Sequence, residues 1–92
     1  MMSNNIVYAR APDAIFSEVD GEFVALNIDR GQCYGMDHIT SKVWSLIETP
    51  RSLEEICVTL QETYDVDPET CRADVAGLLR SLAAEGLITA QI

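Results

Sequence analysis

The sequence predicts an α+β, winged-helix-like fold in which a three-stranded antiparallel sheet is followed by three helices. Three observations support this prediction. Turn signals, Asp-Gly at residues 20–21 and Asp-Arg-Gly at residues 29–31, separate short runs in which apolar residues alternate. After residue 36 the apolar residues recur instead at the spacing of a helix. Two further helix starts follow, at Ser52 and Asp67.

We expect the strands at residues 14–19, 22–28 and 32–36. Asp20-Gly21 favours a tight hairpin between the first two, because both central residues of such a turn take a positive φ. The third strand is the last in the sheet, and nothing after it in the sequence is suited to pair with it. Its outer edge therefore exposes N–H and C=O groups, which either are protected or receive another strand.

The first two helices follow from apolar spacing and end signals. The first has Trp44 beside its apolar stripe and stops at residues 49–51. The stripe comprises Ile39, Val43, Leu46 and Ile47. Ser52 and Glu55 have the spacing of a capping box, which predicts that a second helix begins there.

The third helix has the clearest boundaries. Asp67 is its expected cap, with Pro68 at the first helical position. The helix runs to Glu85 and ends at Gly86. Residues 87–88 then look like a short extended tail that returns toward the sheet.

The chain is long enough for one domain with a modest core, and its 48% hydrophobic content is typical of a folded protein. We expect a loosely held N-terminal arm at residues 1–13 and the domain at residues 14–92. No apolar run approaches the ~20 residues of a membrane span, and the N-terminus lacks the pattern of a secretory signal. Three cysteines without CxxC spacing indicate reduced thiols in a cytoplasmic protein.

Fifteen acidic residues against six basic ones give the chain a formal net charge of −9. A DNA-binding domain needs Lys and Arg to displace counterions from phosphate, so this charge opposes nucleic-acid binding. In DNA-binding winged-helix proteins the third helix enters the major groove. Here that helix offers only Arg72 and Arg80 as bases.

The third helix has an apolar stripe between two different flanks. The stripe is expected in the core and comprises Cys71, Val75, Leu78, Leu79 and Leu82. One flank is typical of a solvated face and consists of Asp74, Ser81 and Glu85. The other is a shallow strip that a second backbone could approach closely, and it consists of Arg72, Ala76 and Ala83. Helix propensity explains these alanines equally well.

If the alanine flank faces the open strand at residues 32–36, the two form a groove. An extended peptide could add to the strand by main-chain hydrogen bonds and rest its side chains on the helix. Each such bond contributes only about 1 kcal/mol net, whereas a micromolar complex needs about 8 kcal/mol. The remainder must come from apolar anchors of the peptide, seated in pockets around Tyr34, Met36, Val75 and Leu79.

The order and spacing of these motifs also resemble a known family. Residues 23–27, 31–37 and 43–47, with the Gly-Leu-Ile end at residues 86–88, are similar to the PqqD-like leader-peptide recognition domains. The resemblance is greatest to the small standalone subunit of lasso-peptide biosynthesis, in which a Tyr-Gly strand and a Trp in the first helix recur. It covers residues 14–88.

The resemblance implies a definite role. Such domains bind the leader of a ribosomally made precursor peptide and present it to a partner enzyme, in lasso systems a separate cysteine-protease-like leader peptidase. The leader adds as a strand to the third strand and lies along the third helix. Carried over to this chain, the leader-binding residues are Gln32, Cys33, Tyr34, Gly35, Met36, Arg72, Val75, Ala76, Leu79 and Ala83.

The residues favour a binding module over an enzyme. His38 is the single histidine, and Cys33 lies on a strand whose alternate residues face opposite ways, which does not favour a catalytic Cys–His pair. HExxH, Walker and Rossmann motifs are missing from the sequence, and one His with three scattered Cys does not predict a zinc site. We therefore expect no enzyme activity, metal or cofactor.

Two other functions stay open from the sequence alone. One is a winged-helix DNA-binding regulator, against which the net charge of −9 argues. The other is a homodimerisation module that uses the same open strand edge.

Overall fold

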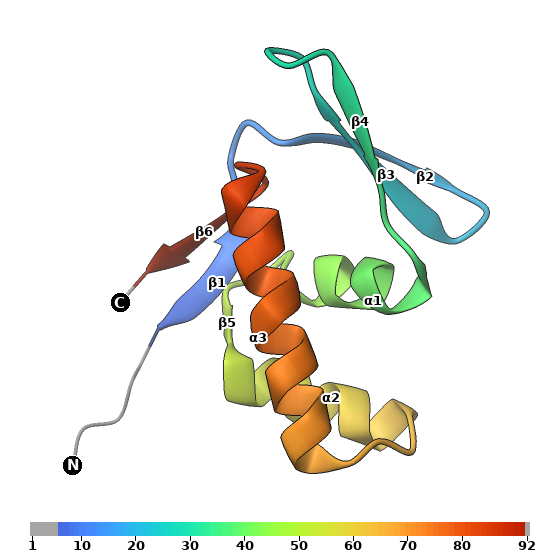
Figure 1. Ribbon diagram of the computed structural model, residues 1–92, viewed down its shortest axis with the longest axis vertical. Coiled ribbons are helices and arrows are strands. Elements are labelled where there is room, and N and C mark those ends of the chain that lie inside the picture. Colours follow the sequence, from blue (N-terminus) through green and yellow to red (C-terminus); the bar gives the residue numbers. More distant parts are fainter. Residues whose placement is uncertain (1–5, 92) are drawn as a thin grey trace.

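The computed structural model describes residues 6–91 and has an α+β fold with three helices and two small antiparallel sheets (Figure 1). The strands are β1 (Val7–Arg10), β2 (Ile15–Val19), β3 (Glu22–Asn27), β4 (Gln32–Gly35), β5 (Arg51–Ser52) and β6 (Ile88–Gln91). The helices are α1 (His38–Leu46), α2 (Leu53–Thr63) and α3 (Pro68–Ala84). The predicted fold class and order of the main elements are confirmed. Among the described residues, no helix is both long and apolar enough to cross a membrane.

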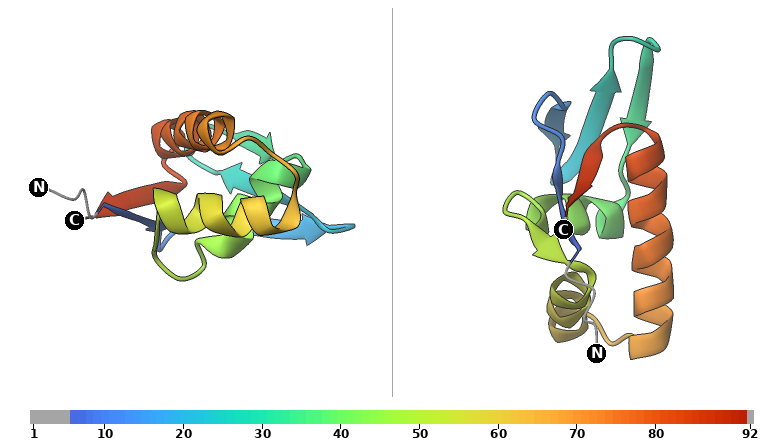
Figure 2. Two further views of the ribbon diagram at one scale, coloured as in Figure 1. Left: turned by 90° about the horizontal axis from the view of Figure 1, so that it is seen from below. Right: turned by 90° about the vertical axis from the view of Figure 1, so that its left-hand side faces the viewer.

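Helix α3 runs along the molecule, and the two sheets and the other helices are arranged around it. Strands β2, β3 and β4 stand beside the C-terminal end of α3, with α1 beneath them, whereas α2 packs along its N-terminal half (Figure 1). The second sheet lies on the other side of the same helix end. Figure 2 shows that the β2–β3–β4 sheet projects beyond the helical part of the molecule.

Strands β2, β3 and β4 form the expected meander, with β3 in the centre. Asp20 and Gly21 have φ values of 54° and 85°, the positive values that a two-residue hairpin turn requires. Phe16, Ala25 and Tyr34 lie opposite one another across the three strands. Directly opposed residues share a face of the sheet, and Ala25 is completely buried. This row therefore marks the face of the meander that packs on the core.

The second sheet, of order β5-β1-β6, was not predicted. β1 lies within the segment expected as a loosely held arm, yet it pairs antiparallel with β5 and along its full length with β6, from Val7↔Gln91 to Arg10↔Ile88. The tail after Gly86 thus joins the opposite end of the chain instead of returning to the meander. Pairing between such distant segments leaves no local pattern in the sequence. Residues 1–5 of the expected arm lie outside the described residues.

The helices begin and end at the predicted signals. Ser52 and Glu55 form the capping box of α2, each side chain accepting a hydrogen bond from the other residue's N–H, at 3.2 and 2.9 Å. Asp67 caps α3 by accepting hydrogen bonds from two backbone N–H groups of its first turn. Gly86 ends α3 with a φ of 75°. The Leu87 N–H then donates back to the last turn of the helix at 3.0 Å, which directs the chain into β6.

The core lies between the three helices and the inner face of the meander. In α1 the stripe is displaced from the predicted one, because Trp44 is completely buried whereas Ile39 is 42% exposed. The buried face of this helix is centred between Val43 and Trp44, so Ile39 falls at its border.

Arg10 connects β1 to both α1 and the meander. Its guanidinium carbon lies 4.8 Å from the centre of the Phe16 ring and 4.9 Å from that of Trp44. The same group donates two hydrogen bonds to the Trp44 carbonyl oxygen, at 2.8 and 3.0 Å. Burial lowers the pKa of Arg10, and the charge of Glu48 opposes this shift. The Arg10 side chain thus connects the end of β1 to the rings of Phe16 and Trp44, which pack edge to face with their centres 5.2 Å apart.

Replacing Arg10 with Ala should lower the free energy of unfolding by about 1–3 kcal/mol, because the stacking and both hydrogen bonds are lost. Urea unfolding followed by the fluorescence of the single tryptophan measures the change. Arg80→Ala, on the exposed side of α3, is the matched control and should change stability by less than about 0.5 kcal/mol. Equal midpoints for Arg10→Ala and the parent chain would contradict a stabilising role.

The three cysteines lie in different environments. Cys33 is exposed, whereas Cys57 and Cys71 are buried between α2 and α3. Burial, with a further contribution from neighbouring Cys71, raises the pKa of the Cys57 thiol to about 11. At a pH below its pKa, a thiol is protonated and reacts poorly with alkylating agents.

Iodoacetamide at about pH 8 should therefore modify Cys33 in the folded protein and spare Cys57 and Cys71, because both are buried and the Cys57 thiol is also protonated at this pH. Peptide mass spectrometry identifies the modified residues. All three should react in guanidinium, which provides the control. Equal rates at the three sites in the native protein would contradict the packing of α2 on α3.

Candidate functional site

The free edge of β4 is the principal feature outside the core. In the described part of the chain β4 pairs only with β3. The Met36 N–H donates to the Phe23 carbonyl at 2.9 Å, so it points toward β3. Because backbone polar groups alternate in direction along a strand, Tyr34 also pairs toward β3. Cys33 and Gly35 therefore direct their N–H and C=O groups away from the sheet.

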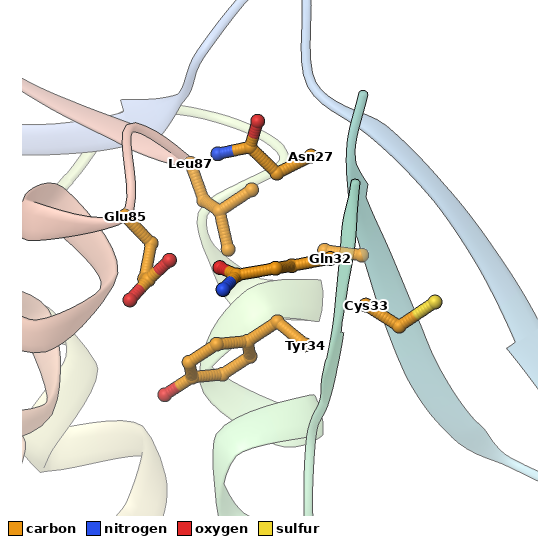
Figure 3. A pocket seen from close by; sticks show the side chains of 7 residues that line it. Asn27, Gln32, Cys33, Tyr34, Glu85 and Leu87 are labelled. Carbon is orange, nitrogen blue, oxygen red and sulfur yellow. The ribbon is translucent and has the colours of Figure 1, made fainter. Parts of the chain in front are cut away.

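A hollow of about 380 Å³ lies between this strand and the C-terminal end of α3 (Figure 3). It is lined by Ala25, Asn27, Gln32, Cys33, Tyr34, Glu85 and Leu87. In Figure 3 the side chains of Gln32 and Tyr34 point from β4 toward α3, and that of Cys33 points to the opposite side of the strand. The hollow thus combines the free edge of a strand with a helix end, two segments far apart in sequence.

The mouth of the hollow is polar and its base is apolar. Glu85 accepts a hydrogen bond from the Arg30 guanidinium at 3.4 Å, and both side chains are partly exposed. The Arg30 N–H donates to the Asn27 side chain at 3.1 Å, which shapes the turn between β3 and β4. Tyr34 packs against the core, and Leu87 is buried. An exposed ion pair contributes only about 0–1 kcal/mol, so a ligand could displace Arg30 from Glu85 at little cost.

The predicted strand residues are divided between the hollow and the core. The side chains of Gln32 and Tyr34 point into the hollow. Cys33 borders the hollow although its side chain points to the other side of the strand, and Gly35 is exposed on the free edge. Met36, Val75 and Leu79 are only 2–3% exposed. These three belong to the core cluster, where they support the site from beneath instead of lining it.

The helix flank beside β4 differs from the one expected. A step of about 100° per residue places Arg72, Ala76 and Ala83 on one side of buried Val75, and Glu85 on the other. Arg72 forms an ion pair with Glu54 at the beginning of α2, whereas Glu85 lines the hollow. Glu85, at the C-terminal end of the flank interpreted as an ordinary solvated face, therefore borders the hollow beside β4. Arg72, Ala76 and Ala83 lie on the opposite flank.

Sequence reasoning missed four residues that line the hollow, namely Ala25, Asn27, Glu85 and Leu87. A helical wheel identifies two flanks but does not tell which of them faces the sheet, so Glu85 had no distinguishing signal. Leu87 and Asn27 were assigned to a tail and a strand. Their position follows from the pairing of β6 with β1, which brings the end of α3 beside β4.

The described residues contain no arrangement for catalysis through His38. Its Nε2 lies 2.7 Å from the Tyr64 hydroxyl oxygen, and Cys33 points away from the hollow on another element. Within the same residues no group of three or more His, Cys, Asp or Glu could hold a metal ion. What the site offers is main-chain hydrogen bonding, one partly paired carboxylate and apolar surface.

Comparisons with known proteins agree with this geometry. A search of curated proteins finds no match. A solved structure described as "TbiB1 in Complex with the TbiA(beta) Leader Peptide" is similar, with 31% sequence identity and a TM-score of 0.80. The similarity covers 87% of this chain and 93% of that one. Residues 22–88 match the family described as "Coenzyme PQQ synthesis protein D (PqqD)". This match spans β3 and β4 of the meander, all three helices and the start of β6, and the chain therefore belongs to the PqqD family.

Proposed function

We propose that this chain binds the leader segment of a ribosomally synthesised precursor peptide by strand addition to β4. It then presents the leader to a separate, cysteine-protease-like leader peptidase in lasso-peptide maturation. The observation that carries this proposal is the unpaired edge of β4 beside the hollow at the end of α3. The similar TbiB1 structure, which is described as a complex with a leader peptide, supports it. Such a domain would act in the cytoplasm, where precursor peptides are made.

The edge provides the main-chain contacts. Cys33 and Gly35 each offer one N–H and one C=O to an added strand. Side chains of that strand alternate between the two faces of the extended sheet. Half of them would therefore point into the hollow, against Tyr34 and Leu87, and the other half would lie on the opposite face, beside Cys33.

Main-chain bonds alone are too weak for a stable complex. At about 1 kcal/mol net for each bond, four of them fall short of the 8 kcal/mol or so that a micromolar affinity needs. The difference must come from an apolar or aromatic side chain of the leader seated in the hollow. Its volume of about 380 Å³ has room for one large side chain. Specificity would then depend on spaced apolar residues of the leader.

The proposed leader-binding residues combine the predicted strand with a revised helix side. Gln32, Cys33, Tyr34 and Gly35 of β4 remain in the set. On the helix side, Leu78 and Ser81 join Glu85, because they occupy the same flank of α3 at spacings of one or two turns. Leu78 is partly buried against the core and Ser81 is exposed, so they would form the floor and the rim.

The other candidate functions have less support. Of the two arginines on α3, Arg72 is paired with Glu54, and the net charge of −9 repels a DNA backbone. Dimerisation through β4 would also bring two strongly acidic copies together. A binding module without catalytic activity agrees best with the contacts of His38 and Cys33 described above.

Replacing Cys33 with Pro should weaken binding of the cognate leader about tenfold or more. The change removes an outward-pointing N–H and places a ring on the free edge, while edge strands tolerate Pro at positions that do not bond to a neighbour. Fluorescence anisotropy with a labelled synthetic leader measures the affinity. Cys33→Ala keeps the N–H and should bind within about twofold of the parent. Equal weakening by the two variants would show that the side chain, and not the backbone edge, is responsible.

Arginine at Ser81 should weaken leader binding by about fivefold or more, because it crowds the rim of the hollow, whereas arginine at Ala83 should have little effect. Both positions are exposed on α3, and both variants add one positive charge to the helix. The same anisotropy titration compares them, and thermal unfolding verifies that both remain folded. A larger loss of affinity from arginine at Ala83 than from arginine at Ser81 would indicate that the leader binds along the flank of Arg72, Ala76 and Ala83.

A further inference from the structure

The outer face of the meander, opposite the core, lacks a partner among the described residues. Ile15, Leu26 and Cys33 lie opposite one another across the three strands, on the face away from Ala25. Ile15 is 44% and Leu26 40% exposed, and Val19 on the same face is 57% exposed. We call this surface the outer face; its residues are Ile15, Val19, Val24, Leu26, Ile28 and Cys33. Contiguous exposed apolar residues of this kind mark interaction sites.

Hollows rimmed by carboxylates lie at both ends of the outer face. At one end a hollow of about 390 Å³ is lined by Ile15, Leu26 and Ile28 together with Asp13 and Asp29. This hollow continues around the end of the sheet to Glu85 and Leu87, so it adjoins the hollow beside β4. At the hairpin end, a second hollow of about 480 Å³ is lined by apolar and acidic residues. Those residues include Val19, Val24, Asp20, Glu22 and Asp37. The surface is therefore an apolar strip with negative charge at each end.

The charge decides between two possible occupants. A second copy of this chain would bring the same carboxylates against these ends, and each copy carries a net charge of −9. Like charges placed together across an interface oppose association. A different protein with basic residues on either side of an apolar surface would complement the strip. Charge complementarity thus favours a hetero-partner over self-association.

The position of the outer face next to β4 indicates which protein would dock on it. A leader added at the free edge would extend the meander, so half of its side chains would continue the outer face beyond Cys33. A protein that docks on this face would contact the bound leader and the domain together. The enzyme that processes the leader is the partner with a reason to make both contacts.

We propose, on the basis of the proposed function, that the outer face is the docking surface for the leader-processing enzyme. The complementary surface of that enzyme is apolar at its centre and carries Lys or Arg at two opposite margins. Leader binding and enzyme docking then use the same small sheet. The leader binds at its edge and inner side, and the enzyme docks on its outer side.

The test compares two double variants, each of which replaces two exposed apolar side chains with Thr. Ile15→Thr/Leu26→Thr alters the outer face and places at both positions a β-branched residue, which suits a strand. Val58→Thr/Val66→Thr is the control, because these residues are 54% and 40% exposed on α2 and the loop after it. For each variant, anisotropy measures the affinity for a labelled synthetic leader peptide. Biolayer interferometry measures the affinity for a purified leader peptidase, at low and high salt.

We expect the outer-face variant to lose about tenfold or more in affinity for the peptidase, and the control variant to stay within about twofold of the parent. Leader affinity should stay within about twofold in both. Added salt should weaken the parent's association with the peptidase. Equal peptidase affinity for the two variants, or a self-associated parent that the outer-face variant converts to monomer, would overturn the docking assignment. Failure of the parent chain to bind the leader would instead contradict the proposed function.

Discussion

The pairing of β1 with β6 joins the two ends of the chain and sets the position of α3 relative to the meander. β1 continues through Ala11 toward β2, and β6 begins directly after the turn that ends α3. The Ala11 N–H donates to the Leu87 carbonyl at 2.9 Å, so both connections are secured at one point. Arg10, on the last residue of β1, adds the stack on Phe16 and Trp44. These contacts hold the end of α3 beside β4, and the hollow follows from that arrangement.

A meander of three strands has only one central strand, and this limits how its surfaces can be used. β3 is paired on both sides, its inner face is covered by the core, and the outward edge of β4 keeps free hydrogen-bonding groups. Such edges promote aggregation unless something opposes it. The large negative charge of the chain supplies an opposing force, because two copies repel one another at close range. The same charge leaves pairing with a neutral or basic polypeptide possible.

Main-chain recognition and side-chain recognition are separated in this site. The edge of β4 can bind any extended segment, since every residue except Pro carries the same backbone groups. Selectivity depends on the hollow, where Tyr34 and Leu87 provide apolar surface and Glu85 a carboxylate. The core residues Met36, Val75 and Leu79 contribute indirectly by fixing β4 and α3 at a constant separation.

The elements that depend on near neighbours could be predicted from the amino-acid sequence. The Asp-Gly hairpin, the capping box of Ser52 and Glu55, and the glycine end of α3 each involve residues within a few positions of one another. Their local geometry is the same whatever surrounds them. The net charge, the open edge of the third meander strand and the family resemblance could also be predicted from the sequence.

Which surfaces meet could not be predicted, because this depends on how the elements pack together. The second sheet joins segments from opposite ends of the chain, and neither segment carries a local signal for the other. The two flanks of α3 could be told apart in sequence, but the docking of the helix brought Glu85 to β4 and turned Arg72 toward Glu54. Periodicity defines the faces of a helix or strand relative to one another. Their orientation in the molecule depends on contacts between residues distant in sequence, which periodicity does not contain.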